Sequence, residues 1–99
     1  GGNQQKISVA KWLAAGTDIL FIDEPTVGID VKTKGYLHEL IIDLSKSGTS
    51  IVLISSDMPE MISLADRIIV MKNFIIKGEK NNDHNYQSMS SSIMEFIHD

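Results

Sequence analysis

Two acidic residues, Asp23 and Glu24, follow the apolar run Ile19–Ile22 without a break. A continuous apolar run that ends in acid predicts a strand buried on both faces of a parallel sheet, with the carboxylates at its end. Phosphoryl transfer needs one group that holds Mg²⁺ through its water shell and another that orients an attacking water. Neighbouring side chains on a strand point to opposite faces, and Pro25 is expected to keep Glu24 extended, so each carboxylate can serve one task. The alternative is a pair of acids that only caps the solvated end of a strand.

A second candidate segment, Ser55-Ser56-Asp57, follows the apolar run Ile51–Ile54 in the same way. Strands that alternate with helices predict an α/β fold with a parallel sheet and crossover helices. Ligands bind at the carboxyl ends of the strands in such sheets. The sequence therefore predicts that the acidic pair and the serine segment both lie where a ligand binds.

The elements that position these segments are predicted from apolar spacing and from helix caps. Asn3, Asp30 and Asp57 are each expected to cap a helix, and Gly16 and Gly48 are expected to end the first two. The predicted helices run from Asn3 to about Gly16, from Asp30 to Ser47, from Asp57 to about Leu64, and over residues 90–97. The predicted strands cover residues 18–23, 50–54 and 67–71, with a hairpin partner at 74–77 and a polar loop at 81–85.

Composition narrows the function classes. Nine Lys and Arg against 13 Asp and Glu give a formal net charge of −4, which disfavours a nucleic-acid backbone as the main partner. The absence of Cys excludes a disulfide framework and a thiolate metal site, and the three His have no partner at metal-ligand spacing. A length of 99 residues allows one domain at most, and no apolar run approaches the ~20 residues of a membrane span. We expect a soluble intracellular domain.

The motifs together resemble those of ABC-type ATPases. Residues 19–26, ILFIDEPT, resemble the Walker B segment, and residues 27–30, VGID, resemble the D-loop that follows it. Residues 1–6, GGNQQK, are similar to the signature motif without its preceding Leu-Ser. The segments ISSDMPE at 54–60 and ADRIIVM at 65–71 narrow the resemblance to the C-terminal cassette of two-cassette ATPases in bacterial ribose-, galactose- and xylose-type importers.

The resemblance implies a fold and two parts of the chain. The fold is part of a P-loop-type ABC ATPase cassette, with parallel strands, crossover helices and a terminal β-hairpin. Residues 1–79 would form the C-terminal portion of the nucleotide-binding domain, with the signature helix, Walker B, D-loop and switch region. Residues 80–99 would form a polar loop and a short C-terminal helix.

The resemblance also implies a role for each matched position. The signature residues would present a helix start and its backbone amides to the γ-phosphate of ATP on the opposing cassette; they are Gly1, Gly2, Asn3 and Gln4. Asp23 would hold Mg²⁺ through water, and Glu24 would polarise the hydrolytic water. Asp30 would contact the facing cassette through the D-loop, and a plain role as a helix N-cap is equally consistent with the sequence.

Two positions depart from the family pattern. Most ABC cassettes have a His that contacts the γ-phosphate where this chain has Ser56, a shorter donor that cannot be cationic at neutral pH. Loss of one preorganised donor typically costs ~10²–10³ in rate, whereas the intact Glu24 favours turnover, so a hydrolytic site and a slow or regulatory site are both open. Phe74 stands where the family usually has Gly, and we expect the hairpin turn to shift by one residue because Asn73 tolerates positive φ better.

The parts of a cassette that this chain lacks bear on its activity and partners. It contains no Gly-rich loop with Lys-Ser/Thr. We therefore expect the chain to be the last portion of a cassette and to be inactive by itself. In the full-length setting the resemblance implies ATP and Mg²⁺ as cofactors and a peripheral place on the cytoplasmic face of the cell membrane. The implied partners are a second cassette in the same polypeptide or a homodimer, the membrane permease subunits and, indirectly, a periplasmic or surface sugar-binding protein. The alternatives are an ABC-type ATPase outside transport, in DNA repair or translation, and a non-catalytic dimerisation or regulatory cassette.

Overall fold

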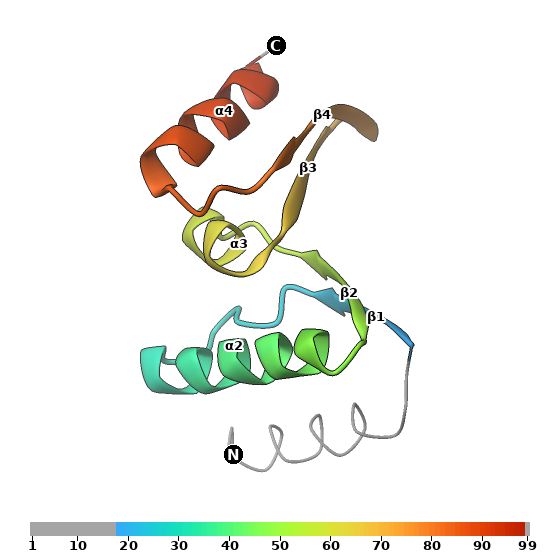
Figure 1. Cartoon of the computed structure of the whole chain (residues 1–99). Coiled ribbons are helices and arrows are strands. Elements are labelled where there is room, and N and C mark those ends of the chain that lie inside the picture. The colour runs from blue at the N-terminus through green and yellow to red at the C-terminus, as the bar shows by residue number, and fades with distance from the viewer. Residues whose placement is uncertain (1–17, 99) are drawn as a thin grey trace. The chain divides into compact units, whose positions relative to one another are not determined.

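The computed structural model describes residues 18–98, which divide into two units, residues 18–54 and residues 55–98 (Figure 1). The helix predicted from Asn3 to Gly16 lies outside the described residues.

The first unit is a strand-helix-strand segment. Strand β1 (Ile19–Asp23) pairs in parallel with β2 (Ser50–Ile54), in a register that runs from Ile19 opposite Ser50 to Asp23 opposite Ile54. Helix α2 (Val31–Lys46) connects the two strands along the chain. The predicted parallel strand-helix-strand order is therefore confirmed.

The ends of α2 follow from local sequence signals. The Asp30 side chain accepts the Thr33 backbone N–H at 2.8 Å and so caps the first turn, as the sequence predicts. Ser47 closes the last turn, and Gly48 takes a φ of 104°, a conformation that a residue with a Cβ rarely adopts. Both ends predicted for this helix are confirmed.

The burial predicted for β1 is wrong for the chain that the structure describes. Leu20 is buried, but Ile19 and Phe21 on the alternate side are 59% and 70% exposed. The apolar run predicts a strand that is covered on both faces, whereas the described residues cover only one face of β1. The core of this unit is correspondingly small and consists of Leu20, Leu37 and Ile41.

The second unit pairs a β-hairpin with two helices. It contains α3 (Met58–Leu64), β3 (Arg67–Lys72), β4 (Ile75–Asn81) and α4 (Tyr86–His98), with β3 and β4 antiparallel. One core cluster joins α3, β3 and α4, and its buried members are Ile62, Ile68, Val70, Met89 and Ile93. Met89 is fully buried. No helix among residues 18–98 is both long and apolar enough to cross a membrane.

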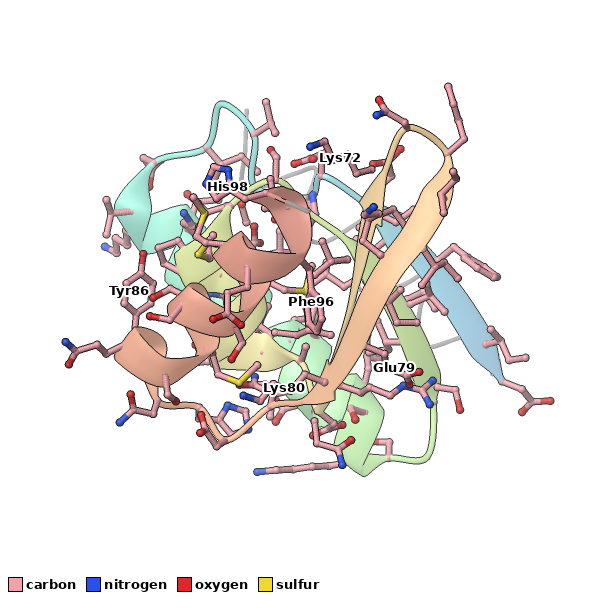
Figure 2. The ribbon with its side chains drawn as sticks, turned by 90° about the horizontal axis from the view of Figure 1, so that it is seen from above. Lys72, Glu79, Lys80, Tyr86, Phe96 and His98 are labelled. Carbon is pink, nitrogen blue, oxygen red and sulfur yellow. The ribbon has the colours of Figure 1, made fainter. Side chains whose placement is uncertain are left out.

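Polar and aromatic contacts fasten α4 to the hairpin (Figure 2). Lys72 Nζ donates to the Ile97 carbonyl at 2.7 Å, and Lys80 Nζ donates to Ser92 Oγ at 2.7 Å. A Cβ added at Gly78 would overlap the Phe96 ring, so the glycine lets that ring lie directly on β4. The hairpin and α4 therefore pack as one body.

Three expectations for this unit differ from the structure. Strand β4 covers residues 75–81 rather than 74–77, and α4 begins at Tyr86 rather than at residue 90. The helix starts earlier because Asn85 Oδ1 accepts the Ser88 backbone N–H at 3.0 Å, a cap hidden within the polar tract. The expected shift of the hairpin turn is also wrong. Asn73 and Phe74 form a two-residue turn with φ values of 52° and 64° between the paired residues 72 and 75.

Candidate functional site

The two predicted carboxylates lie on either side of the end of β1. Asp23 is the last residue of the strand and is exposed, whereas Glu24 lies just beyond it and is half-buried. The Glu24 backbone N–H donates to the Ile54 carbonyl at 2.7 Å, which extends the β1–β2 pairing by one hydrogen bond. The strand's alternation between faces ends at Asp23, so it does not decide where the Glu24 side chain points.

The backbone of Glu24 is in the left-handed region, with a φ of 47°. The expectation that Pro25 holds Glu24 extended is therefore wrong, because the hydrogen bond to Ile54 and the turn that follows outweigh the bias from proline. A non-glycine residue in this region costs roughly 1–2 kcal/mol and persists where its surroundings fix it. Such strain is frequent at functional sites, and here it falls on the residue predicted to orient water.

Two consecutive turns lead from Glu24 to α2. The Val27 N–H points to the Glu24 carbonyl at 3.4 Å, and the Ile29 N–H donates to the Thr26 carbonyl at 3.2 Å. Thr26 is 8% exposed, which makes it the one buried uncharged polar side chain among residues 18–98. Thr26 is the last residue of the segment that resembles Walker B, and the sequence assigns it no task of its own.

Asp30 closes this loop as the N-cap of α2. Its carboxylate accepts the Thr33 N–H at 2.8 Å and the Thr33 hydroxyl at 3.1 Å. Of the two roles open for Asp30, the helix cap is therefore present. Contact with a facing cassette stays a prediction, and both roles are compatible because Asp30 remains exposed.

The serine segment at the start of α3 is held by a hydrogen-bonded relay. The Asp57 backbone N–H donates to Ser55 Oγ at 3.0 Å, and Ser55 Oγ donates to Glu60 Oε2 at 2.9 Å. The Glu60 N–H donates in turn to Asp57 Oδ1 at 2.9 Å. Glu60 is 2% exposed, whereas Ser56 is exposed between the two fixed neighbours. The sequence identified Glu60 only as a helix-start signal and missed its burial.

Similar sequences occur among sugar import ATP-binding proteins. The chain is 51% identical over 95 residues to the ribose import ATP-binding protein RbsA of Clostridium perfringens (strain SM101 / Type A), a match over 96% of this chain. It is 49% identical over 78 residues, 79% of this chain, to the galactose/methyl galactoside import ATP-binding protein MglA of Escherichia coli (strain K12). Most of the chain therefore aligns with one segment of sugar import ATP-binding proteins. It spans only 18% and 15% of the lengths of these two relatives, and no family model matches it.

Solved cassette structures support the same fold. The chain aligns over 98% of its length with MJ1267, an ATP-binding cassette of an ABC transporter, at a TM-score of 0.77 and 18% identity, and it covers 39% of that chain. It also aligns with CbiO1 of Clostridium perfringens at a TM-score of 0.74 and 21% identity, over 94% of this chain and 36% of the other. The predicted fold, part of an ABC cassette, is confirmed.

The structure distributes the predicted cassette residues unevenly. It brings Asp23, Glu24 and Asp30 onto one strand end and the loop that follows it, within residues 18–54. Ser56 belongs to the other unit, residues 55–98. The four signature residues, Gly1, Gly2, Asn3 and Gln4, lie outside the described residues.

The donor set fits one kind of Mg²⁺ site. Residues 18–98 contain no group of three or more His, Asp or Glu side chains that could hold a metal together. Mg²⁺ usually keeps several waters and takes one or two carboxylates together with nucleotide phosphates. The exposed Asp23 carboxylate suits that arrangement and would hold a hydrated ion that a nucleotide brings with it.

Proposed function

We propose that this chain is part of the ATP-binding and ATP-hydrolysing subunit of an ABC importer for monosaccharides. The observation that carries the proposal is its identity of about half with ribose and galactose import ATP-binding proteins. The acidic pair at the end of β1 provides the residue types that the reaction needs. In the full-length subunit, hydrolysis at this site would be coupled to sugar transport.

Each site residue has one task in this proposal. Glu24 orients the attacking water, and its tethered backbone fixes the start of its side chain, which reduces reorganisation during the reaction. Asp23 holds hydrated Mg²⁺, which would neutralise charge on the phosphates when bound. Ser56 donates to the γ-phosphate as a neutral group.

The remaining residues and partners follow from the same proposal. The signature residues 1–4 would bind ATP held by an opposing cassette, and Asp30 would contact that cassette. The subunit would act at the cytoplasmic face of the membrane with permease subunits and, through them, an extracytoplasmic sugar-binding protein. This chain by itself is expected to bind ATP weakly and to show no turnover.

A non-catalytic regulatory cassette is the second candidate. Ser56 favours it, because a neutral hydroxyl stabilises developing phosphate charge less than a cationic side chain does. Such a cassette would bind ATP and serve its partner's site without using Glu24. The relatives named as sugar import proteins and the formal charge of −4 disfavour a role in DNA repair or translation.

ATP turnover by a Glu24→Gln variant tests the proposal. The assay uses the full-length subunit, with the catalytic carboxylate of the other cassette replaced in every sample. We expect Glu24→Gln to lower kcat by at least ~10²-fold, because Gln keeps the size of the side chain but orients water poorly. The matched control is Glu39→Gln, the same change at an exposed position of α2, which should leave kcat within about twofold. Equal turnover by wild type and Glu24→Gln would refute the proposal.

A further inference from the structure

Glu60 is the one acidic or basic side chain that is buried among residues 18–98, and the reaction described above does not use it. Burial of a carboxyl group is costly unless hydrogen bonds compensate. Its Oε2 accepts a hydrogen bond from the hydroxyl of Ser55, the residue before Ser56, at 2.9 Å. Both the cost and the partner point to a role for Glu60 beyond that of an ordinary surface residue at the start of a helix.

The relay differs from a standard capping box in a way that involves Ser56. In a capping box, the acid at the third helical position accepts the backbone N–H of the cap residue directly. Here the Asp57 N–H donates a hydrogen bond to Ser55 Oγ, and the Ser55 hydroxyl donates a hydrogen bond to Glu60. A side chain two residues before the helix cap is thereby included in the network. Ser56 lies between its two fixed members.

We propose that Glu60 is a positioning residue for Ser56, an inference that rests on the proposed function. Serine has a single short side-chain torsion, so its hydroxyl follows the backbone and cannot correct for a displaced main chain as a longer side chain can. Glu60 fixes the Ser55 hydroxyl, and this hydroxyl fixes the Asp57 amide on the other side of Ser56. Loss of Glu60 leaves the Ser55 hydroxyl free to rotate and releases that amide, which lets the backbone at Ser56 move.

The test is a double-mutant cycle on the full-length subunit, with the other cassette silenced as above. The variants are Glu60→Ala, Ser55→Ala and the double variant, with kcat and KM measured for ATP. We expect each single variant to lower kcat about tenfold and to leave the KM for ATP within about twofold, because a displaced Ser56 affects the transition state more than binding. The double variant should be no slower than the slower single variant, since both changes break one relay.

Two further variants separate positioning from general damage. Glu60→Gln keeps the length of the side chain and one acceptor oxygen, so it should return kcat to within about threefold of wild type. Glu95→Ala, the same truncation at an exposed residue of α4, should not change kcat. If Glu60 had a purely structural role, Glu60→Ala would lower the fraction of subunits that bind nucleotide and would leave the turnover per bound nucleotide unchanged. Ser55→Ala, a near-isosteric change at a half-buried site, gives a folded variant even where Glu60→Ala is poorly folded.

The outcomes distinguish the inference from the function on which it rests. Turnover that requires Glu24 but is unchanged in Glu60→Ala and Ser55→Ala would overturn the inference alone. Losses that multiply in the double variant would also overturn it, because independent effects do not form a relay. Turnover that does not require Glu24 would overturn the proposed function and this inference together.

Discussion

Residues 18–54 and residues 55–98 contain similar amounts of regular structure, but they bury it differently. The second unit packs α3, β3 and α4 around a cluster centred on Met89, which is fully buried. The first unit leaves Phe21 70% exposed on the strand that carries the acidic pair. Among the described residues, the strand that carries the acidic pair therefore has an uncovered apolar face, whereas the hairpin unit has a core of its own.

Truncation of one large apolar residue in each unit should give the largest contrast. Met89→Ala removes a fully buried side chain and should lower the free energy of unfolding by about 3 kcal/mol. Phe21→Ala should change it by less than about 1 kcal/mol, since most of that ring already contacts solvent. Urea unfolding followed by circular dichroism measures both. A Phe21→Ala cost as large as that of Met89→Ala would show that the two units do not differ in this way.

Two Gly→Ala substitutions should act with opposite signs. Gly78→Ala places a methyl group against the Phe96 ring and should destabilise the hairpin unit by about 2 kcal/mol. Gly35→Ala lies within α2, where an added Cβ meets no atom within 4 Å, and should stabilise the first unit by about 0.5–1 kcal/mol. Thermal unfolding of the two variants gives the sign directly. Stabilisation by Gly78→Ala would contradict the packing of Phe96 on β4.

Phe74 in the second unit, like Glu24 in the first, is a non-glycine residue in the left-handed region. Phe74 is fully exposed at a φ of 64°, so no burial of its own offsets the strain. Phe74→Gly should stabilise the hairpin by about 0.5–1 kcal/mol, because glycine adopts this conformation without a steric penalty. Asn73→Gly is the control and should gain less, since Asn tolerates the left-handed region. Equal gains at both positions would indicate that Phe74 is not strained.

The smallest expected effect concerns pH and the start of α4. The Asn85 backbone N–H, with help from the Ser88 hydroxyl, holds the pKa of Asp83 below its ordinary value of 3.8. Because the folded state lowers this pKa, the stabilisation is present above about pH 4 and is lost as pH falls through the folded value. Asp83→Asn should therefore remove a small part of the acid dependence of unfolding, measured as midpoint against pH between about 2 and 5. An unchanged acid dependence would show that the ionised Asp83 carboxylate does not stabilise the folded state.

Local sequence signals predicted most of the fold. Asp30 and Asp57 were predictable as caps because each acts on an amide three residues away. The early start of α4 was not, because the Asn85 cap lies in a tract of similar polar residues. The burial of β1 could not be predicted either. The apolar content of a strand indicates that both faces can be buried, but it does not indicate whether other residues cover them.

The candidate site was predictable in residue type but not in conformation. Asp23 and Glu24 stand at the strand end as their position in the sequence suggests. The left-handed backbone of Glu24 depends on the Ile54 carbonyl, a partner 30 residues away that no local pattern contains. The burial of Glu60 depends in the same way on packing that the Asp-x-x-Glu spacing does not encode.

Catalysis by Glu24 is tested most directly by measuring bound nucleotide and its hydrolysis in one sample of the full-length subunit, with the catalytic carboxylate of the other cassette replaced. We expect wild type to bind ATP and convert it to ADP, and Glu24→Gln to bind the same amount and retain it as ATP. Wild type that also retains its nucleotide as ATP would contradict catalysis by Glu24 and would make this cassette a regulatory one.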